Sequence, residues 1–146
     1  MSDEAEVEIA RLAAPAEAFA GRLVGLLNDA ARSSGHGFEE TPLVLEARAG
    51  GAFAGGLMGH LENGVFYVRR LAVSPEARTG GIGRALMATA EDWARERGAR
   101  AVFLDTFGFQ APDFYPRLGY VEAFRLPGRT GSEARFYYVK RLDEAS

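Results

Sequence analysis

Apolar residues recur at two periods along the chain, and these periods predict strands mixed with helices. At the start of residues 7–12, the polar Glu8 lies between the apolar Val7 and Ile9, and the segment predicts a short first strand. A helix is expected from Pro15 to about Ala31, because proline suits the first helical turn. The apolar positions that share one face of this helix are Phe19, Leu23, Leu26 and Leu27.

Three further strands are expected at 43–48, 52–62 and 65–73, where apolar residues recur between turn signals. Glycine-containing turns separate them, and the second turn contains Asn63-Gly64, a dipeptide that favours tight hairpins. The three strands therefore predict an antiparallel meander.

The clearest helix is expected at 81–97, where apolar residues form one stripe and Gly98 follows as a terminator. A strand is expected at 101–107. Strand 65–73, this helix and strand 101–107 together predict a βαβ unit, whose crossover should be right-handed and whose strands should be parallel.

A short helix around 112–118, a strand from Tyr120 and a last strand at 134–142 complete the expected elements. The chain shows no repeat and no linker, so residues 1–146 predict a single domain. The expected class is α/β of the α+β type: a mixed, mostly antiparallel sheet of six or seven strands, a central βαβ unit and flanking helices.

Composition narrows the function. The net charge of −3 disfavours broad nucleic-acid binding, which needs a basic face. The chain has no cysteine and only two histidines, so no metal site is expected. The acidic N-terminus lacks the basic start of a secretory signal, and no apolar run could span a bilayer, so a soluble, cytoplasmic protein without a membrane partner is expected.

The most informative segment is the glycine-rich loop between strand 65–73 and the helix after it. It contains Arg78, Thr79, Gly80, Gly81, Ile82, Gly83 and Arg84. The first amides of a helix lack intrahelical acceptors and lie at the positive end of the helix dipole. Glycines let a ligand approach the backbone closely, so this loop suits an anion such as a pyrophosphate.

Alternative interpretations of the loop are weaker. In a chain with this much glycine and arginine the pattern can arise by chance, and a tight turn that binds nothing would look the same. A Walker loop requires a lysine, which this loop lacks. A dinucleotide-binding fingerprint requires a small residue where Leu86 stands, although Asp105 lies at the distance of a ribose-binding acid.

A second motif, Phe114-Tyr115-Pro116-Arg117-Leu118-Gly119-Tyr120, follows in the order and spacing that a known family shows. With the Arg-x-x-Gly-x-Gly pattern of the loop, it resembles the GNAT superfamily of acetyl-CoA-dependent N-acetyltransferases over about residues 43–142. The resemblance implies a GNAT-like fold and acetyl-CoA as cosubstrate, with no metal. Tyr120 stands where the family usually has phenylalanine, and Pro116 is a mild departure.

The resemblance also assigns roles. Backbone amides from Arg78 through Arg84 would hold the CoA pyrophosphate, with Gly81 and Gly83 leaving room for the phosphates. The end of the strand before the loop would hold the pantetheine arm and polarise the thioester carbonyl; its residues are Leu71, Ala72 and Val73. Gln110, just after strand 101–107, could contact CoA or substrate, or be structural.

Tyr115 would be the catalytic general acid that protonates the departing thiolate, because a phenol is protonated at neutral pH. An aromatic side chain packed on the sheet is the alternative. The sequence does not identify the general base. The family often has an acid shortly before the Leu-x-Val segment, where this chain has Arg69 and Arg70. The remaining candidates are Glu46, His60, Glu62 and Asp105, each of which could be structural instead.

An arginine that faces the cleft would favour a substrate with a carboxylate or phosphate, and strand alternation predicts that only one of Arg69 and Arg70 can do so. The expected function is an N-acetyltransferase that acetylates the primary amine of a small molecule by direct attack. A catalytically idle acyl-CoA-binding module and a protein or peptide N-acetyltransferase are the alternatives. A homodimer is compatible with the sequence, although no feature requires one.

Overall fold

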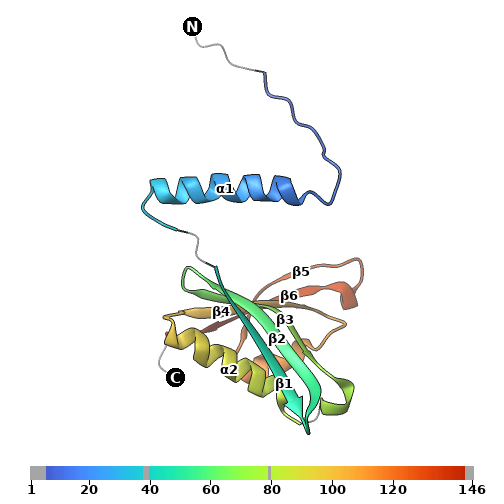
Figure 1. Cartoon of the computed structure of the whole chain (residues 1–146). Helices are drawn as coiled ribbons and strands as arrows, with labels where there is room; N and C mark the ends of the chain where they lie inside the picture. The colour runs from blue at the N-terminus through green and yellow to red at the C-terminus, as the bar shows by residue number, and fades with distance from the viewer. Residues whose placement is uncertain (1–5, 38–39, 79, 144–146) are drawn as a thin grey trace. The chain divides into compact units, whose positions relative to one another are not determined.

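Six strands form one sheet in the order β1-β2-β3-β4-β6-β5 in the computed structural model, which describes residues 6–37, 40–78 and 80–143 (Figure 1). The strands are β1 (Glu40–Ala49), β2 (Ala52–Glu62), β3 (Val65–Val73), β4 (Ala101–Phe107), β5 (Val121–Leu126) and β6 (Arg135–Arg141). The helices are α1 (Glu17–Ser33) and α2 (Ile82–Glu96), with short 3₁₀ turns η1 (Pro75–Ala77), η2 (Pro112–Phe114), η3 (Pro116–Leu118) and η4 (Gly131–Glu133).

The strand pairing confirms the predicted fold class. β1, β2 and β3 form the expected antiparallel meander, and β4 pairs with β3 in parallel across the α2 crossover. β6 lies between β4 and β5 and is antiparallel to both. The parallel pair and the crossover helix are the predicted βαβ unit, within a sheet that is otherwise antiparallel.

The core of this sheet lies on the face that α2 covers. Leu57 of β2, Phe66 of β3 and Val102 and Leu104 of β4 are almost completely buried there. The apolar stripe of α2 packs against them through Leu86, Met87, Ala90 and Ala94. Because strand side chains alternate between faces, the residues between these core positions point to the opposite face of the sheet.

The prediction of a strand at 7–12 is wrong. Residues 6–12 form neither helix nor strand and are exposed, and the part of the sheet that the structure describes begins with β1. A strand is stable only when its backbone pairs with a neighbour, so an alternating pattern alone does not make one. α1 is present but begins at Glu17, two positions after Pro15, and ends at Ser33.

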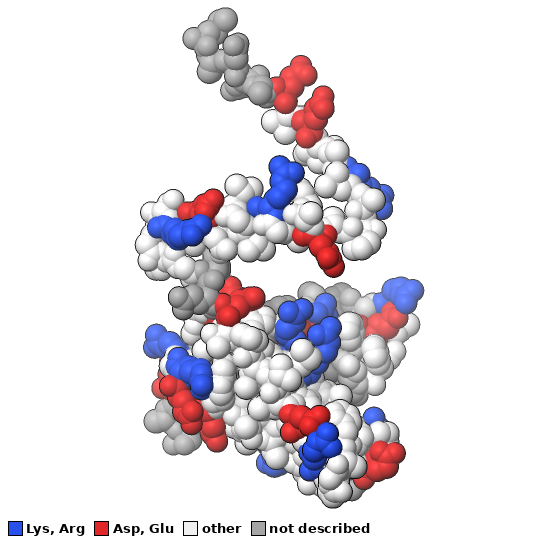
Figure 2. Space-filling model, viewed as in Figure 1, with Lys and Arg blue, Asp and Glu red and all other residues white. Residues whose placement is uncertain are grey.

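The chain divides into two units at residues 38–39, the first containing α1 and the second containing the sheet and α2. The single domain expected over 1–146 stays a prediction. Acidic and basic side chains are interspersed over the visible face of the second unit (Figure 2). No helix among the described residues has both the length and the hydropathy needed to cross a bilayer.

Candidate active site

The two strands of the βαβ unit diverge partway along their length. β3 pairs with β4 only from Val65 to Tyr67, opposite Ala101 to Phe103, although both strands continue for several residues. Beyond this point, the backbone groups of β3 that face β4 have no strand partner. The predicted segment Leu71, Ala72 and Val73 lies in this opening, still paired with β2 on its other side. Its free amides are therefore available to a ligand.

The glycine loop connects the end of β3 to the start of α2. Gly81 is the N-cap of α2 and has a positive φ of 74°, which favours glycine. The amides of Ile82, Gly83 and Arg84 lack intrahelical acceptors because they belong to the first turn, and no side chain caps this end of the helix. The guanidinium of Arg78 donates to the Val73 carbonyl at 3.3 Å and ties the loop to the strand end. Thr79 lies outside the described residues.

The loop and the aromatic motif meet in space. A Cβ atom on Gly83 would lie 3.2 Å from the ring of Phe114 and 3.7 Å from a methyl group of Val73. The sequence predicts that Gly83 leaves room for a phosphate, whereas its missing side chain makes room for Phe114. The same is not true of Gly81, where a Cβ atom would meet nothing within 4 Å.

Tyr115 follows Phe114 at the end of η2 and packs among aromatic rings. Its ring centroid lies 5.0 Å from that of Phe114, 6.0 Å from Tyr120 and 5.9 Å from Tyr138. Burial, with a smaller contribution from the Asp105 carboxylate, raises the pKa of Tyr115 to about 12. Among the described residues, none hydrogen-bonds to its hydroxyl, so this proton is free to be donated.

This environment predicts how Tyr115 titrates. Because its pKa is about 12 in the folded chain and about 10 in the unfolded chain, folding favours the protonated phenol. The resulting stability is fully present below about pH 10 and is lost as the pH rises toward 12. The phenolate absorbance of the wild type minus that of Tyr115→Phe should show a step near pH 12. A step near pH 10 would contradict the burial of this phenol.

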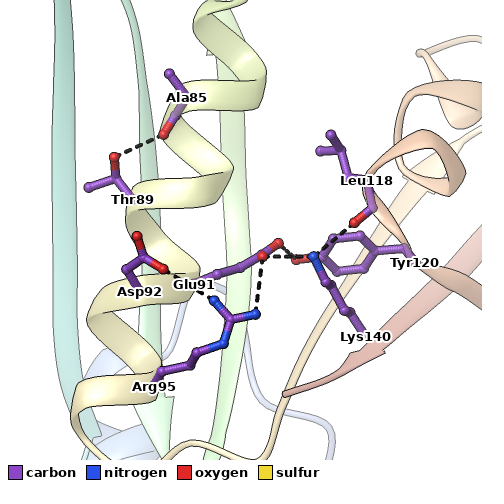
Figure 3. Close-up of polar contacts among 8 residues, drawn as sticks. All are labelled: Ala85, Thr89, Glu91, Asp92, Arg95, Leu118, Tyr120 and Lys140. Atoms are coloured by element: carbon purple, nitrogen blue, oxygen red, sulfur yellow. Dashed lines mark hydrogen bonds and ion pairs between the residues drawn. The ribbon is translucent and has the colours of Figure 1, made fainter. Parts of the chain in front are cut away.

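A buried polar network ties the aromatic motif to α2 (Figure 3). The Tyr120 hydroxyl donates to Glu91 at 2.8 Å, and the Lys140 ammonium donates to Glu91 and to the Leu118 carbonyl, each at 2.8 Å. Glu91 is only 6% exposed. Burial, with the Glu91 carboxylate second, raises the pKa of Tyr120, so this phenol stays protonated and serves as a donor.

On the face of the sheet opposite α2, a second polar group borders the opening. The Asp105 carboxylate accepts from the Tyr67 hydroxyl at 3.0 Å and from the Arg135 guanidinium at 2.8 Å. The Tyr67 ring stacks on Phe103 with centroids 4.5 Å apart. Burial, then the hydrogen bond to Asp105, raises the pKa of Tyr67. Each oxygen of the Asp105 carboxylate thus accepts one hydrogen bond within the protein.

The other base candidates separate into two groups. His60 packs edge-on against Tyr67 and lies 3.6 Å from Glu62, so these two residues share the face of Asp105. Glu46 instead forms an exposed ion pair with Arg48 at 2.9 Å. Adjacent strands also bring Glu40 to 3.4 Å from His60, and the three side chains could together hold a metal ion. The expected absence of a metal stays a prediction.

An open hollow of about 640 Å³ adjoins the Asp105 group, and sequence reasoning missed it. Arg135 belongs to both, because it pairs with Asp105 and lines the hollow. The lining residues are Phe107, Phe109, Leu126, Pro127, Gly128, Arg129, Glu133 and Arg135. They come from three strands and two loops, so no local motif marks them.

Gln110 lies in the turn after β4, at the end of the strand where the opening lies. Its side-chain carbonyl accepts from the Phe107 amide at 2.8 Å and from the Thr106 hydroxyl at 3.1 Å. A ligand contact would therefore come from its amide N–H groups.

Comparisons with known proteins agree with this geometry. The model of the acetyltransferase (GNAT) family matches residues 12–120. A blasticidin-S acetyltransferase of Streptomyces morookaense is 40% identical over 63% of this chain and 68% of its own length. An acetyltransferase of Agrobacterium fabrum is 34% identical over 60% of this chain and 64% of its own, just under two thirds. The crystal structure of a Bacillus cereus acetyltransferase is 25% identical, covers 93% of this chain and 98% of its own, and has a TM-score of 0.78.

The family match spans the glycine loop, the strand opening and the aromatic motif, which the structure brings to one place. The chain therefore belongs to the acetyltransferase (GNAT) family and is an acyltransferase enzyme.

Proposed function

We propose that this enzyme moves an acetyl group from acetyl-CoA to the primary amine of a small molecule by direct attack, with Tyr115 as general acid. The observation that carries the proposal is the convergence of three features: the opening between β3 and β4, the uncapped start of α2, and the partly buried Tyr115 phenol, to which no described residue hydrogen-bonds. Each suits one part of the reaction.

The opening and the loop fit acetyl-CoA. Free amides at the start of α2, with Arg78 and Arg84 nearby, would bind the pyrophosphate. Amides at the end of β3 would hold the pantetheine arm and stabilise negative charge on the thioester oxygen. Acetyl-CoA supplies the activated acyl group. Among proteins of this fold, a streptothricin acetyltransferase of Bacillus anthracis was solved in complex with acetyl coenzyme A.

Tyr115 fits the general acid. A phenol with a pKa of about 12 is protonated at every physiological pH, and its hydroxyl has no competing partner among the described residues. A departing thiolate is the anion that such a donor can neutralise. The amine must arrive neutral, with Asp105, His60 and Glu62 as the nearby candidates to take its proton, directly or through water.

A small acceptor fits the hollow beside Asp105. Its volume of about 640 Å³ lies in the range of small-molecule sites, and apolar side chains with a few charged groups line it. The most informative relative named after its substrate is a blasticidin-S acetyltransferase, 40% identical to this chain where the two align. This relative supports a small amine over a protein or peptide acceptor.

The proposal is tested by measuring CoA thiol release with a panel of small primary amines, amino acids and peptides, and by identifying the acetylated product by mass. We expect turnover on a small amine. Tight acetyl-CoA binding without turnover on any acceptor would instead favour an idle acyl-CoA-binding module. Turnover confined to peptides would favour a peptide N-acetyltransferase.

The role of the glycine loop in binding acetyl-CoA is best tested by a substitution at Gly80. A Cβ atom there would meet only the Ala77 carbonyl, at an ordinary 3.6 Å, so a side chain is tolerated. In Gly80→Glu, a carboxylate beside the start of α2 should compete with the pyrophosphate and weaken acetyl-CoA binding roughly 10- to 100-fold. Isothermal titration calorimetry measures the affinity.

Gly80→Gln is the matched control, because it adds the same bulk without the charge. It should lose far less affinity for acetyl-CoA. The melting temperatures of the two variants should agree within about 2 °C. Equal affinities for the two variants would show that no anion binds at this loop.

A further inference from the structure

A β-bulge places two arginines side by side where strand alternation would separate them. Met58 of β2 pairs with Arg70, while the next residue, Gly59, pairs with Val68. Arg69 is therefore an extra residue in β3, and the alternation of faces is interrupted there. Both Arg69 and Arg70 are exposed, between the buried Val68 and the half-buried Leu71. The strict alternation on which the prediction for this pair rests is therefore absent here, so both side chains can lie on one face.

The bulge lies at the start of the opening. Tyr67, the last residue of β3 that pairs with β4, immediately precedes Val68 and the two arginines. Arg70 lies opposite Met58, which is exposed on the face of the sheet that α2 does not cover. The positive charge of Arg69 reaches the Tyr67 phenol, where it opposes the rise in pKa. Arg69 therefore lies near the Tyr67–Asp105–Arg135 group, and Arg70 follows it directly in the chain.

These two cations have no counter-ion in the part of the chain that the structure describes. Most other arginines of the second unit pair with a carboxylate: Arg48, Arg95, Arg97, Arg100, Arg125, Arg129, Arg135 and Arg141. Asp105, the acid of the neighbouring polar group, is already held by Arg135. Two adjacent unpaired guanidinium groups at the mouth of a cleft attract an anion and can bind it in a bidentate manner.

We infer that Arg69 and Arg70 bind an anionic group, a carboxylate or a phosphate, on the acceptor whose amine enters the opening. This inference rests on the proposed function, because it names the class of acceptor for the same site. The acceptor is then an amine with a negatively charged group at a short distance from its nitrogen. The guanidinium groups hold that group and direct the amine toward the end of β3.

The test compares matched acceptors that differ only in charge. Linear amino acids, their carboxamides and the aminoalkyl phosphates of the same length are assayed for kcat/KM by CoA thiol release. The wild type should prefer an anionic acceptor over its carboxamide by roughly 10- to 100-fold, the effect of one charge-assisted contact. The better of the carboxylate and phosphate series identifies the anion.

The double variant Arg69→Gln/Arg70→Gln should bring the ratio of anionic to neutral acceptor close to one, through a higher KM for the anionic acceptor. Arg48→Gln is the control, because this arginine lies on β1 in an ion pair with Glu46 and should keep the wild-type ratio. If the wild type acetylates amines but its kcat/KM is about the same for anionic and neutral acceptors, this inference alone is overturned. Failure to acetylate any amine would overturn the proposed function itself.

Discussion

Replacement of Tyr115 by phenylalanine is expected to lower kcat roughly 10²- to 10⁴-fold, the usual contribution of a general acid. The substitution removes one hydroxyl and keeps the ring that packs against Phe114, Tyr120 and Tyr138. Since no described residue hydrogen-bonds to this hydroxyl, the fold loses no internal partner. Acetyl-CoA affinity and the melting temperature should therefore stay close to those of the wild type.

Tyr137→Phe is the matched control for this experiment. Tyr137 is a half-buried phenol on β6 whose ring stacks on Phe124, and it lies outside the aromatic cluster of Tyr115. Its loss should leave kcat within about threefold of the wild type. If Tyr115→Phe had an equally small effect, water or another group would protonate the thiolate and the assigned role would be wrong.

Replacement of Lys140 by methionine is expected to lower the free energy of unfolding by about 3–5 kcal/mol, because it removes the closer of the two cations that pair with the buried Glu91 carboxylate. The remaining cation, Arg95, is a weaker partner, because it lies 3.9 Å from Glu91, is exposed and also pairs with Asp92 at 3.2 Å. For a chain of this size, the loss corresponds to a fall in melting temperature of about 10 °C. Denaturant unfolding followed by circular dichroism measures it.

The double variant Glu91→Leu/Lys140→Met is the control. It removes both charges, and replacement of a buried ion pair by apolar side chains is often neutral, so it should be more stable than Lys140→Met. A single variant that loses less than about 1 kcal/mol would show that the pair is not buried as described. Lys140 is the only lysine of the chain, and its ammonium reaches both Glu91 and the Leu118 carbonyl.

Periodicity predicted the sheet well where local sequence determines structure. The turn at Asn63-Gly64 and the crossover through α2 were correct, because a hairpin turn and an amphipathic helix are encoded by neighbouring residues. The strand at 7–12 was wrong, because its existence depends on a pairing partner elsewhere in the chain.

The site was predictable in its parts but less so in its arrangement. The glycine loop and Tyr115 were found from motifs, although Gly83 proves to accommodate Phe114, a contact between distant segments. The bulge at Arg69 breaks the period-two rule and depends on strand register, which the sequence does not reveal. The hollow beside Asp105 is assembled from three strands and two loops, so only the fold shows it.

The most direct test of the account is amide hydrogen exchange with and without acetyl-CoA, at a ligand concentration of about 100 times Kd. Exchange should slow, up to roughly 100-fold, at Ile82, Gly83 and Arg84 and at the end of β3, where free amides would bind the ligand. The β1 and β5 strands should exchange as before. Protection confined to β5 and β6, with the start of α2 unchanged, would contradict the account.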